Sequence, residues 1–396
     1  MHDRFSSTFP PRAAAPVGPP HRAAQVLPLW PERWHVVFDE REHPLWISPG
    51  TAPFYKRSLS HLIPDRATAL RARALLQLHR VLPRAGILTE IRLPRALRRM
   101  LSFDFALRGV WRAALRIGPV GPRQKASLVI ATDAGDGIAF AGIAMTPGAD
   151  SRIGAEIESL RRLAGMPHVA DRVPQLLADG ITLAGRRYFI TTLAPGARRS
   201  DALTPGHLRF LSMLAQARPE VCPFHVSPYL RRIELMLARL QARIDRDTRV
   251  VLWEALRECA VQLSRWRGPF VMAHGDFAPR NICVAGDEIF VCNWEKARSG
   301  ANPLADFLSF LSSVRPDALA RASAFSVAIR AVGERARCVH PTCAWSYAVV
   351  AALTLAWLIE TMVQYCTENE CYDAGDALVR RHARLIEARS AWLVPF

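Results

Sequence analysis

The sequence is nearly devoid of lysine. Lysine occurs only at Lys56, Lys125 and Lys296, so almost all of the 52 basic residues in this chain of 396 are arginines. Between Lys56 and Arg123 the chain carries 15 basic and three acidic residues, which gives this window a net charge of +12 out of +17 for the whole chain. Such a charge attracts anionic partners, so residues 56–123 are a candidate docking surface for an anionic membrane or another protein. A coding bias toward arginine explains the same composition. Because no nucleic-acid-binding motif accompanies the charge, we expect no specific nucleic-acid binding.

Cysteine is absent from the first 221 residues. All eight cysteines follow, and none of them forms a CxxC pair. This distribution argues against a disulfide framework and for a reducing compartment, so we expect a cytoplasmic protein. Two CxxxxC pairs, Cys338 with Cys343 and Cys366 with Cys371, have the widest spacing found in zinc-binding patterns. Buried thiols without a metal are the favoured interpretation.

Long apolar segments are also scarce. Residues 1–28 are rich in proline, alanine and arginine without the apolar stretch of a signal peptide, and we expect them to form a disordered tail. The one membrane-like run, residues 347–363, is short for a span of about 20 residues and contains Glu360. It therefore predicts a buried core helix, and we expect no transmembrane segment.

What the chain does contain is enough apolar sequence for a large core. Half of its residues are hydrophobic and 22% are charged, and its length suits two domains or one large bilobal domain. Residues 29–105 have a mixed pattern that favours helices. In residues 106–196 three strand-like segments, a helical segment at 150–165 and two further strand-like segments follow one another, which predicts a small antiparallel sheet with one helix. Residues 197–396 carry long amphipathic helical runs. The predicted fold class is α+β.

One polar loop interrupts the helical part. The stretch HGDFAPRNI, residues 274–282, lies between two apolar segments, and Asp276 precedes Asn281 by five positions with Pro279 between them. A carboxylate can accept a proton from a substrate hydroxyl, and a carboxamide oxygen can hold a hard cation such as Mg²⁺. The spacing D-x-x-x-x-N is typical of the catalytic loop of phosphoryl-transfer enzymes.

This loop, together with the stretch NWEKARSGANPLADFLSF that follows at 293–310, resembles the aminoglycoside phosphotransferase and choline kinase group of protein-kinase-like enzymes. The resemblance covers about residues 110–365 and is strongest at 273–310. It implies a bilobal protein-kinase-like fold, with residues 106–196 as the nucleotide-binding N-lobe and residues 197–396 as the C-lobe. It also implies ATP and Mg²⁺ as cofactors and transfer of the γ-phosphate to a hydroxyl of a sugar, amino alcohol or aminoglycoside-like acceptor.

The resemblance assigns roles to individual residues. It implies that Asp276 is the catalytic base, that His274 is a structural member of the same loop, and that Asn281 is a metal ligand. Asp306 is implied to brace the loop backbone from the next helix. A plain structural interpretation of each residue is a polar group that satisfies the hydrogen bonds of a turn.

Two positions depart from the family pattern. Asn293 stands where the family has a metal-binding aspartate, which weakens Mg²⁺ binding, and Glu295 is the nearest residue that could supply the missing charge. Gly142 stands on the third strand where a phosphate-binding lysine is expected.

Other residues are predicted to complete the nucleotide site. Lys125 is the candidate replacement for the missing lysine, with Glu156, or alternatively Glu158, as its partner. Thr192 and Leu193 complete the predicted nucleotide-binding residues. Residues 118–122 form a loop that could cover phosphates, although its two prolines lack N–H donors.

Two functions remain open from the sequence. The first is an ATP-dependent phosphotransferase acting on a small hydroxylated molecule. The second is a pseudokinase that binds a nucleotide or small ligand, or acts as a scaffold, and Asn293 and Gly142 favour it. Arginines are interspersed with the acidic residues of the helical part, so the sequence predicts no dedicated pocket for a polycationic acceptor. Those acidic residues are Glu254, Glu258, Glu360, Glu368, Glu370, Asp373 and Asp376.

Overall fold

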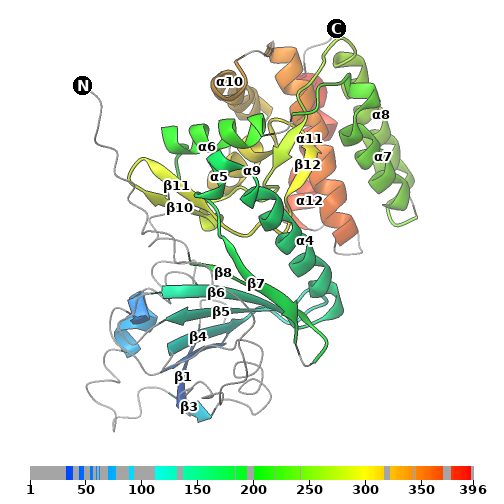
Figure 1. Cartoon of the computed structure of the whole chain (residues 1–396). Helices are drawn as coiled ribbons and strands as arrows, with labels where there is room; N and C mark the ends of the chain where they lie inside the picture. The colour runs from blue at the N-terminus through cyan, green and yellow to red at the C-terminus, as the bar shows by residue number, and fades with distance from the viewer. Residues whose placement is uncertain are drawn as a thin grey trace, which may run out of the picture. The chain divides into compact units, whose positions relative to one another are not determined.

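The computed structural model of the chain (Figure 1) divides into two compact units. Unit 1 comprises residues 1–165, 170–198 and 290–295, and unit 2 comprises residues 166–169, 199–289 and 296–396. The structure describes residues 33–38, 44–48, 54–56, 59, 62, 70–76, 89–92, 112–131, 137–182, 184–193, 200–217, 219–240, 242–315, 322–341, 343, 345–368 and 376–393. The expected tail at 1–28 and most of the arginine-rich window lie outside these residues.

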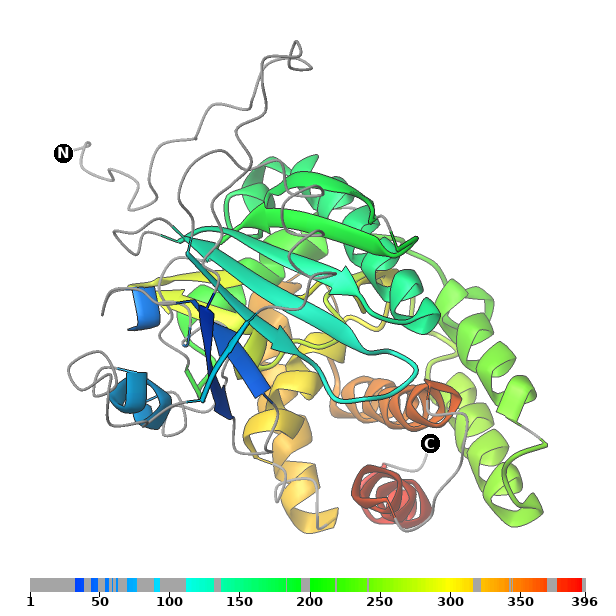
Figure 2. The ribbon, with the colours of Figure 1, turned by 90° about the horizontal axis from the view of Figure 1, so that it is seen from below.

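Unit 1 is built on an eight-stranded sheet in the order β3-β1-β2-β4-β5-β6-β8-β7, in which every neighbouring pair is antiparallel. Figure 2 shows the twist of this sheet. The strands are β1 (Arg33–Phe38), β2 (Pro44–Ile47), β3 (Thr89–Arg92), β4 (Arg112–Ile117), β5 (Lys125–Ala131), β6 (Gly137–Ala144), β7 (Leu176–Ile181) and β8 (Arg187–Thr192). The five predicted strands are present. The sequence pattern did not predict β1, β2 and β3, which come from the extension at 29–105.

Both faces of the central strands are buried. Alternate residues of β4 separate onto the two faces, so that Ala113 and Leu115 join one apolar cluster while Ala114 joins another. Helix α4 (Pro147–Ala164) begins after Thr146 with proline in its first turn, and its buried side chains Ile153 and Ile157 pack with Phe189 of β8. This packing fixes α4 against the sheet and thereby places the polar residues that α4 carries.

Unit 2 is mainly helical. Its helices are α6 (Pro205–Gln216), α7 (Pro228–Leu240), α8 (Arg246–Gln262), α9 (Ala305–Val314), α10 (Ala322–Val339), α11 (Tyr347–Glu368) and α12 (Ala377–Glu387), after the short α5 (Pro167–Ala170). Strand β9 (Val271–Ala273) pairs with β12 (Arg298–Ala301), and β10 (Ile282–Ala285) pairs with β11 (Glu288–Val291). In the sequence β9 precedes the polar loop and β10 follows it, and the last two residues of β11 belong to unit 1.

Helix α11 is the apolar run that the sequence identified. Among the described residues it is the one helix long and apolar enough to cross a membrane, and 78% of its most apolar stretch is buried inside the protein. Such burial is typical of a core helix. Of the described cysteines, Cys259 and Cys366 are buried and Cys338 is exposed, whereas Cys371 lies outside the described residues.

Candidate active site

The loop at 274–282 is anchored in unit 2 by apolar packing. It follows the buried strand β9, and its residue Phe277 is fully buried and stacked on Phe210 at 6.2 Å between ring centroids. Gly275 has a φ of +78°, and a Cβ at this position would lie 2.4 Å from the carbonyl oxygen of Lys296. The glycine of the HGD motif is therefore required both by backbone conformation and by space.

Asp306, in the first turn of α9, holds the loop backbone. Its Oδ2 accepts a hydrogen bond from the N–H of His274 at 2.8 Å, and its Oδ1 accepts one from Gly275 at 3.0 Å. Burial raises the pKa of Asp306, while these N–H donors and His274 oppose the increase. His274 is itself buried, and its Nδ1 accepts a hydrogen bond from the N–H of Asp276 at 3.1 Å. His274 therefore positions the loop.

Both carboxylate oxygens of Asp276 have partners. The side-chain nitrogen of Asn281 donates to Oδ2 at 2.9 Å and to the main-chain oxygen of Asp276 at 2.8 Å. Arg280, which stands four positions after Asp276, forms an ion pair with Oδ1. Sequence analysis assigned no role to Arg280, although the sequence places it four positions after Asp276 in the same tight loop. These contacts hold the carboxylate in a fixed orientation.

The predicted metal ligands supply poor donors for Mg²⁺. Asn281 donates its amide hydrogens to Asp276 and has only a neutral oxygen left for a cation. Asn293 also offers a neutral amide, and no group of three or more His, Cys, Asp or Glu side chains in the described part of the chain could hold a metal ion. Since Mg²⁺ in proteins is usually bound through one or two carboxylates, the neutral side chains of Asn281 and Asn293 do not fit this ion.

A cluster of charged residues forms in unit 1. Lys125 Nζ lies 2.5 Å from Oε2 of Glu295, and Arg152 Nη1 lies 3.1 Å from Oε1 of the same carboxylate. Glu295 was the candidate to replace the charge lost at Asn293. The structure instead pairs both of its oxygens with cations. Arg152, in the second turn of α4, was not predicted, because nothing local in the sequence links it to Glu295, which follows it by more than 140 residues.

Glu156 is the buried member of this group. It accepts a hydrogen bond from the N–H of Trp294 at 3.2 Å, and burial raises its pKa to about 7 against the opposing effect of Lys125. The alternative, Glu158, is exposed and pairs with Arg162 one turn along α4. Glu156 is therefore the glutamate that faces the cluster.

The place of the missing lysine on β6 is filled by an aromatic ring. Gly142 lies directly opposite Phe189 in the β6–β8 register, and a Cβ at 142 would lie 2.5 Å from Cε1 of that ring. Lys125 pairs with Ala144, two positions further along β6. Because opposite residues on neighbouring strands share a face, Lys125 projects from the same face of the sheet as position 142.

Asn293 has an unusual backbone. Its φ of +67° is the one positive value among the described non-glycine residues. Asparagine and aspartate adopt this left-handed conformation more readily than other side chains. An aspartate at this position, as in the family pattern, would suit the same backbone.

The remaining predicted nucleotide-binding residues lie at the end of β8. Thr192 exchanges hydrogen bonds with Gln175, whose N–H donates to the Thr192 hydroxyl oxygen at 2.9 Å and whose carbonyl accepts from the Thr192 N–H at 2.9 Å. Leu193 is partly buried against an apolar cluster of unit 1. The contacts of Thr192 are structural, and a role for either residue in nucleotide binding stays a prediction.

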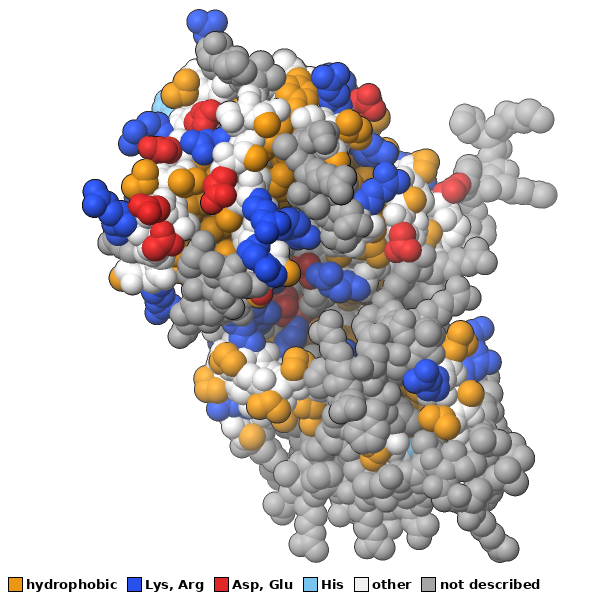
Figure 3. All heavy atoms as spheres, turned by 180° about the vertical axis from the view of Figure 1, so that it is seen from behind, with side chains coloured by type: hydrophobic (Ala, Val, Ile, Leu, Met, Phe, Trp, Pro, Cys, Tyr) orange, Lys and Arg blue, Asp and Glu red, His pale blue; other side chains and the backbone are white. Residues whose placement is uncertain are grey.

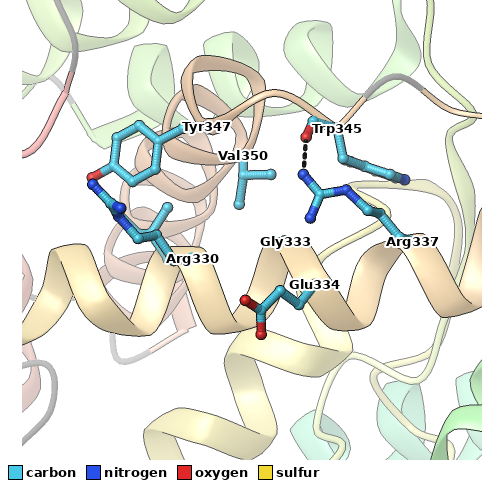
Figure 4. Close-up of a pocket in the computed structure, with 8 residues that line it drawn as sticks. Arg330, Gly333, Glu334, Arg337, Trp345, Tyr347 and Val350 are labelled. Carbon is cyan, nitrogen blue, oxygen red and sulfur yellow. Dashed lines mark hydrogen bonds between the residues drawn. The ribbon is translucent and has the colours of Figure 1, made fainter.

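A separate cavity of about 170 Å³ lies in unit 2 between α10 and the start of α11 (Figure 4). In this view the guanidinium of Arg330 lies over the ring of Tyr347, 5.5 Å from its centroid, and Arg337 donates to the carbonyl of Trp345 at 2.8 Å. None of the predicted site residues lines this cavity, and its two arginines are engaged with its own walls.

Comparison with known proteins places these observations in a family. No curated protein is significantly similar in sequence to this chain. Among solved structures, a thermostable mutant of aminoglycoside phosphotransferase APH(4)-Ia in ternary complex with AMP-PNP and hygromycin B is 15% identical over 69% of this chain and 93% of that chain, with a TM-score of 0.47. The GDP and kanamycin complex of APH(2″)-IIIa is 12% identical over 70% of this chain and 93% of that chain, also with a TM-score of 0.47. A Haemophilus somnus 129PT protein assigned as a fructosamine-3-kinase is 16% identical over 69% of this chain and 91% of that chain, with a TM-score of 0.44.

The sequence match to a family model is decisive. The model of the phosphotransferase enzyme family matches residues 139–337, half of the chain, a range that includes Glu156, the loop at 274–282, Asn293 and Asp306. The chain therefore belongs to the phosphotransferase enzyme family.

Proposed function

We propose that this protein transfers the γ-phosphate of ATP to the hydroxyl of a small molecule such as a sugar or an amino alcohol, with Asp276 as the base. The observation that carries the proposal is the oriented carboxylate of Asp276, held by Arg280 and Asn281 in a loop that Asp306 braces. Family membership supports the reaction class.

The chemistry assigned to the loop is a proton transfer coupled to displacement. The acceptor oxygen forms a bond to the γ-phosphorus while the bond from that phosphorus to the β,γ-bridging oxygen breaks. The acceptor proton passes to a carboxylate oxygen of Asp276, and ADP leaves with the electrons of the broken bond. Catalysis of this kind depends mainly on positioning and charge neutralisation. Arg280 and Asn281 contribute by fixing the carboxylate before the acceptor arrives.

The charges of unit 2 favour a neutral acceptor over a polycation. Glu360 is buried and paired with Arg232 at 3.0 Å and Arg298 at 3.1 Å, and Glu258 pairs with Arg389 at 2.6 Å. The other described acidic residues of the predicted set also have partners: Glu254 with Arg389, Glu368 with Lys296, and Asp376 with Tyr365 and the start of α12. On the face seen in Figure 3, basic side chains lie among acidic and apolar ones. These pairings leave little free negative charge among the described members of the predicted acidic set, as expected if the acceptor is not a polycation.

A second candidate function is nucleotide or ligand binding without turnover. It is favoured by Asn293, which lacks the metal-binding carboxylate, and by Phe189, which fills the space beside Gly142 where the family lysine would stand. The two candidates share the fold and differ only in whether Asp276 acts on an acceptor.

Consumption of ATP in the presence of sugars, amino alcohols and aminoglycosides separates the two candidates. We expect turnover with at least one neutral hydroxylated acceptor, and a fall of about 100-fold or more in Asp276→Asn. Asp287→Asn, which changes an exposed carboxylate in the β10–β11 turn of the same unit, is the matched control and should retain full activity. Equal rates for wild type and Asp276→Asn would show that Asp276 is not the catalytic base. No turnover with any acceptor would favour the binding protein.

A further inference from the structure

Two cations in unit 1 share the carboxylate of Glu295. Lys125 and Arg152 each leave 25% of their side chain exposed, whereas Glu295, which contacts both, is only 7% exposed. The carboxylate therefore lies beneath the two cations, and their outer sides remain accessible. Both cations share Glu295, and the second carboxylate near Lys125, that of Glu156, is buried, so a further anion can reach the exposed sides of the two cations.

The main chain fixes both cations beside an exposed loop. Lys125 is the first residue of β5 and directly follows residues 118–124, and its carbonyl accepts from the N–H of Gly118 at 2.8 Å. Helix α4, which carries Arg152, is joined to the same loop because the Thr146 hydroxyl donates to the carbonyl of Pro122 at 2.6 Å. Gly148 permits this approach, since a Cβ there would lie 2.3 Å from the Pro122 oxygen.

The predicted metal donors of this chain carry little charge, whereas Lys125 and Arg152 supply two cations. Asn281 and Asn293 are neutral, and Glu295 is already engaged, so a divalent cation finds little charge to hold it. The negative charge of a polyphosphate still has to be neutralised. An ammonium supplies a compact positive charge, and a guanidinium can bind two phosphate oxygens at once.

We propose that Lys125 and Arg152 bind the phosphate groups of the nucleotide directly and that this binding requires no divalent cation. The inference deepens the proposed function and rests on it for the identity of the ligand. Glu295 positions the two side chains. Arg152 becomes a phosphate-binding residue in addition to those that the resemblance implied.

Calorimetric titration with ATP, in excess EDTA and in excess MgCl₂, tests the proposal on the intact chain. We expect similar affinity in the two buffers. In EDTA, Lys125→Met and Arg152→Met should each weaken ATP binding by about tenfold or more, because each removes a charge-assisted contact while keeping an apolar stem. Arg161→Met is the matched control, since Arg161 lies on the same helix, pairs with Asp179 and is 61% exposed.

Binding that occurs only with Mg²⁺ would overturn the inference, as would wild-type affinity in both methionine variants. The comparison of the two buffers uses wild-type protein and therefore does not depend on the folding of any variant. Failure of the proposed function has a different outcome: ATP binds in EDTA, yet no acceptor is phosphorylated. Turnover with an acceptor, together with ATP binding that requires Mg²⁺, would retain the function and reject the inference.

Discussion

Substitution of Gly142 by alanine tests the explanation for the missing lysine on β6. The added Cβ would lie 2.5 Å and 2.6 Å from Cε1 and Cζ of Phe189 and 3.3 Å from Cδ1 of Ile153. Both neighbours are buried in the packing between α4 and the sheet, so neither can move without disturbing others. Overpacking of this kind costs about 1–3 kcal/mol, and alanine in place of a strand glycine returns about 0.5–1 kcal/mol. We therefore expect a net loss of up to about 2.5 kcal/mol.

Thermal unfolding followed by tryptophan fluorescence measures this loss. A decrease of about 2–4 °C in Tm is expected for each kcal/mol in a unit of this size. Phe189→Leu vacates the space, so Gly142→Ala should cost less in that background, with a coupling free energy of about 1 kcal/mol between the two sites. The same reasoning predicts that Gly142→Lys destabilises unit 1 and restores no function. An equal effect of Gly142→Ala in both backgrounds, or stabilisation in wild type, would refute the explanation.

Three further predictions concern Arg280, Asn293 and two buried histidines. Arg280→Gln should lower kcat by about tenfold with little change in KM, because Arg280 orients the carboxylate of Asp276. Steady-state kinetics measure kcat and KM. A rise in KM with kcat unchanged would contradict this role of Arg280. Asn293→Asp should make ATP binding stronger in MgCl₂ than in EDTA, because it adds a carboxylate at a position whose backbone suits aspartate. Calorimetry measures both affinities. Equal affinities in the two buffers would contradict the view that the neutral side chain of Asn293 weakens Mg²⁺ binding. Burial lowers the pKa of His207 and His382 from 6.5 to about 4, so the unfolded chain binds protons that the folded chain does not. The contribution of each histidine should therefore be constant above about pH 6.5 and should lower stability by up to about 3 kcal/mol between about pH 6.5 and 4. Denaturant unfolding measures the difference between wild type and His382→Gln, which should widen as pH falls through this range, and an unchanged difference would contradict the prediction.

The sequence predicted the elements whose signals are local. The helical spacing of Ile153 and Ile157 predicted α4, and the five strands around it follow from short apolar segments separated by turns. The spacing of Asp276 and Asn281 predicted one tight loop that carries both residues, and in the structure a hydrogen bond of 2.9 Å joins their side chains.

The features that escaped prediction depend on contacts distant in the sequence. Strands β1, β2 and β3 complete the sheet through pairings such as that of Trp46 with Leu115, which no local pattern specifies. Arg152 and Glu295 meet only because α4 packs on the sheet and residues 290–295 join unit 1. The ring of Phe189 explains Gly142, but the composition of β6 alone gives no sign of it.

Phosphorus-31 NMR of the protein with ATP and an accepted hydroxylated substrate tests the central claim most directly. We expect the γ-phosphate signal of ATP to decrease as a phosphomonoester signal of the acceptor increases in equal amount. Asp276→Asn should abolish this exchange while still binding ATP. Conversion of the γ-phosphate only to inorganic phosphate, or an unchanged rate in Asp276→Asn, would contradict it.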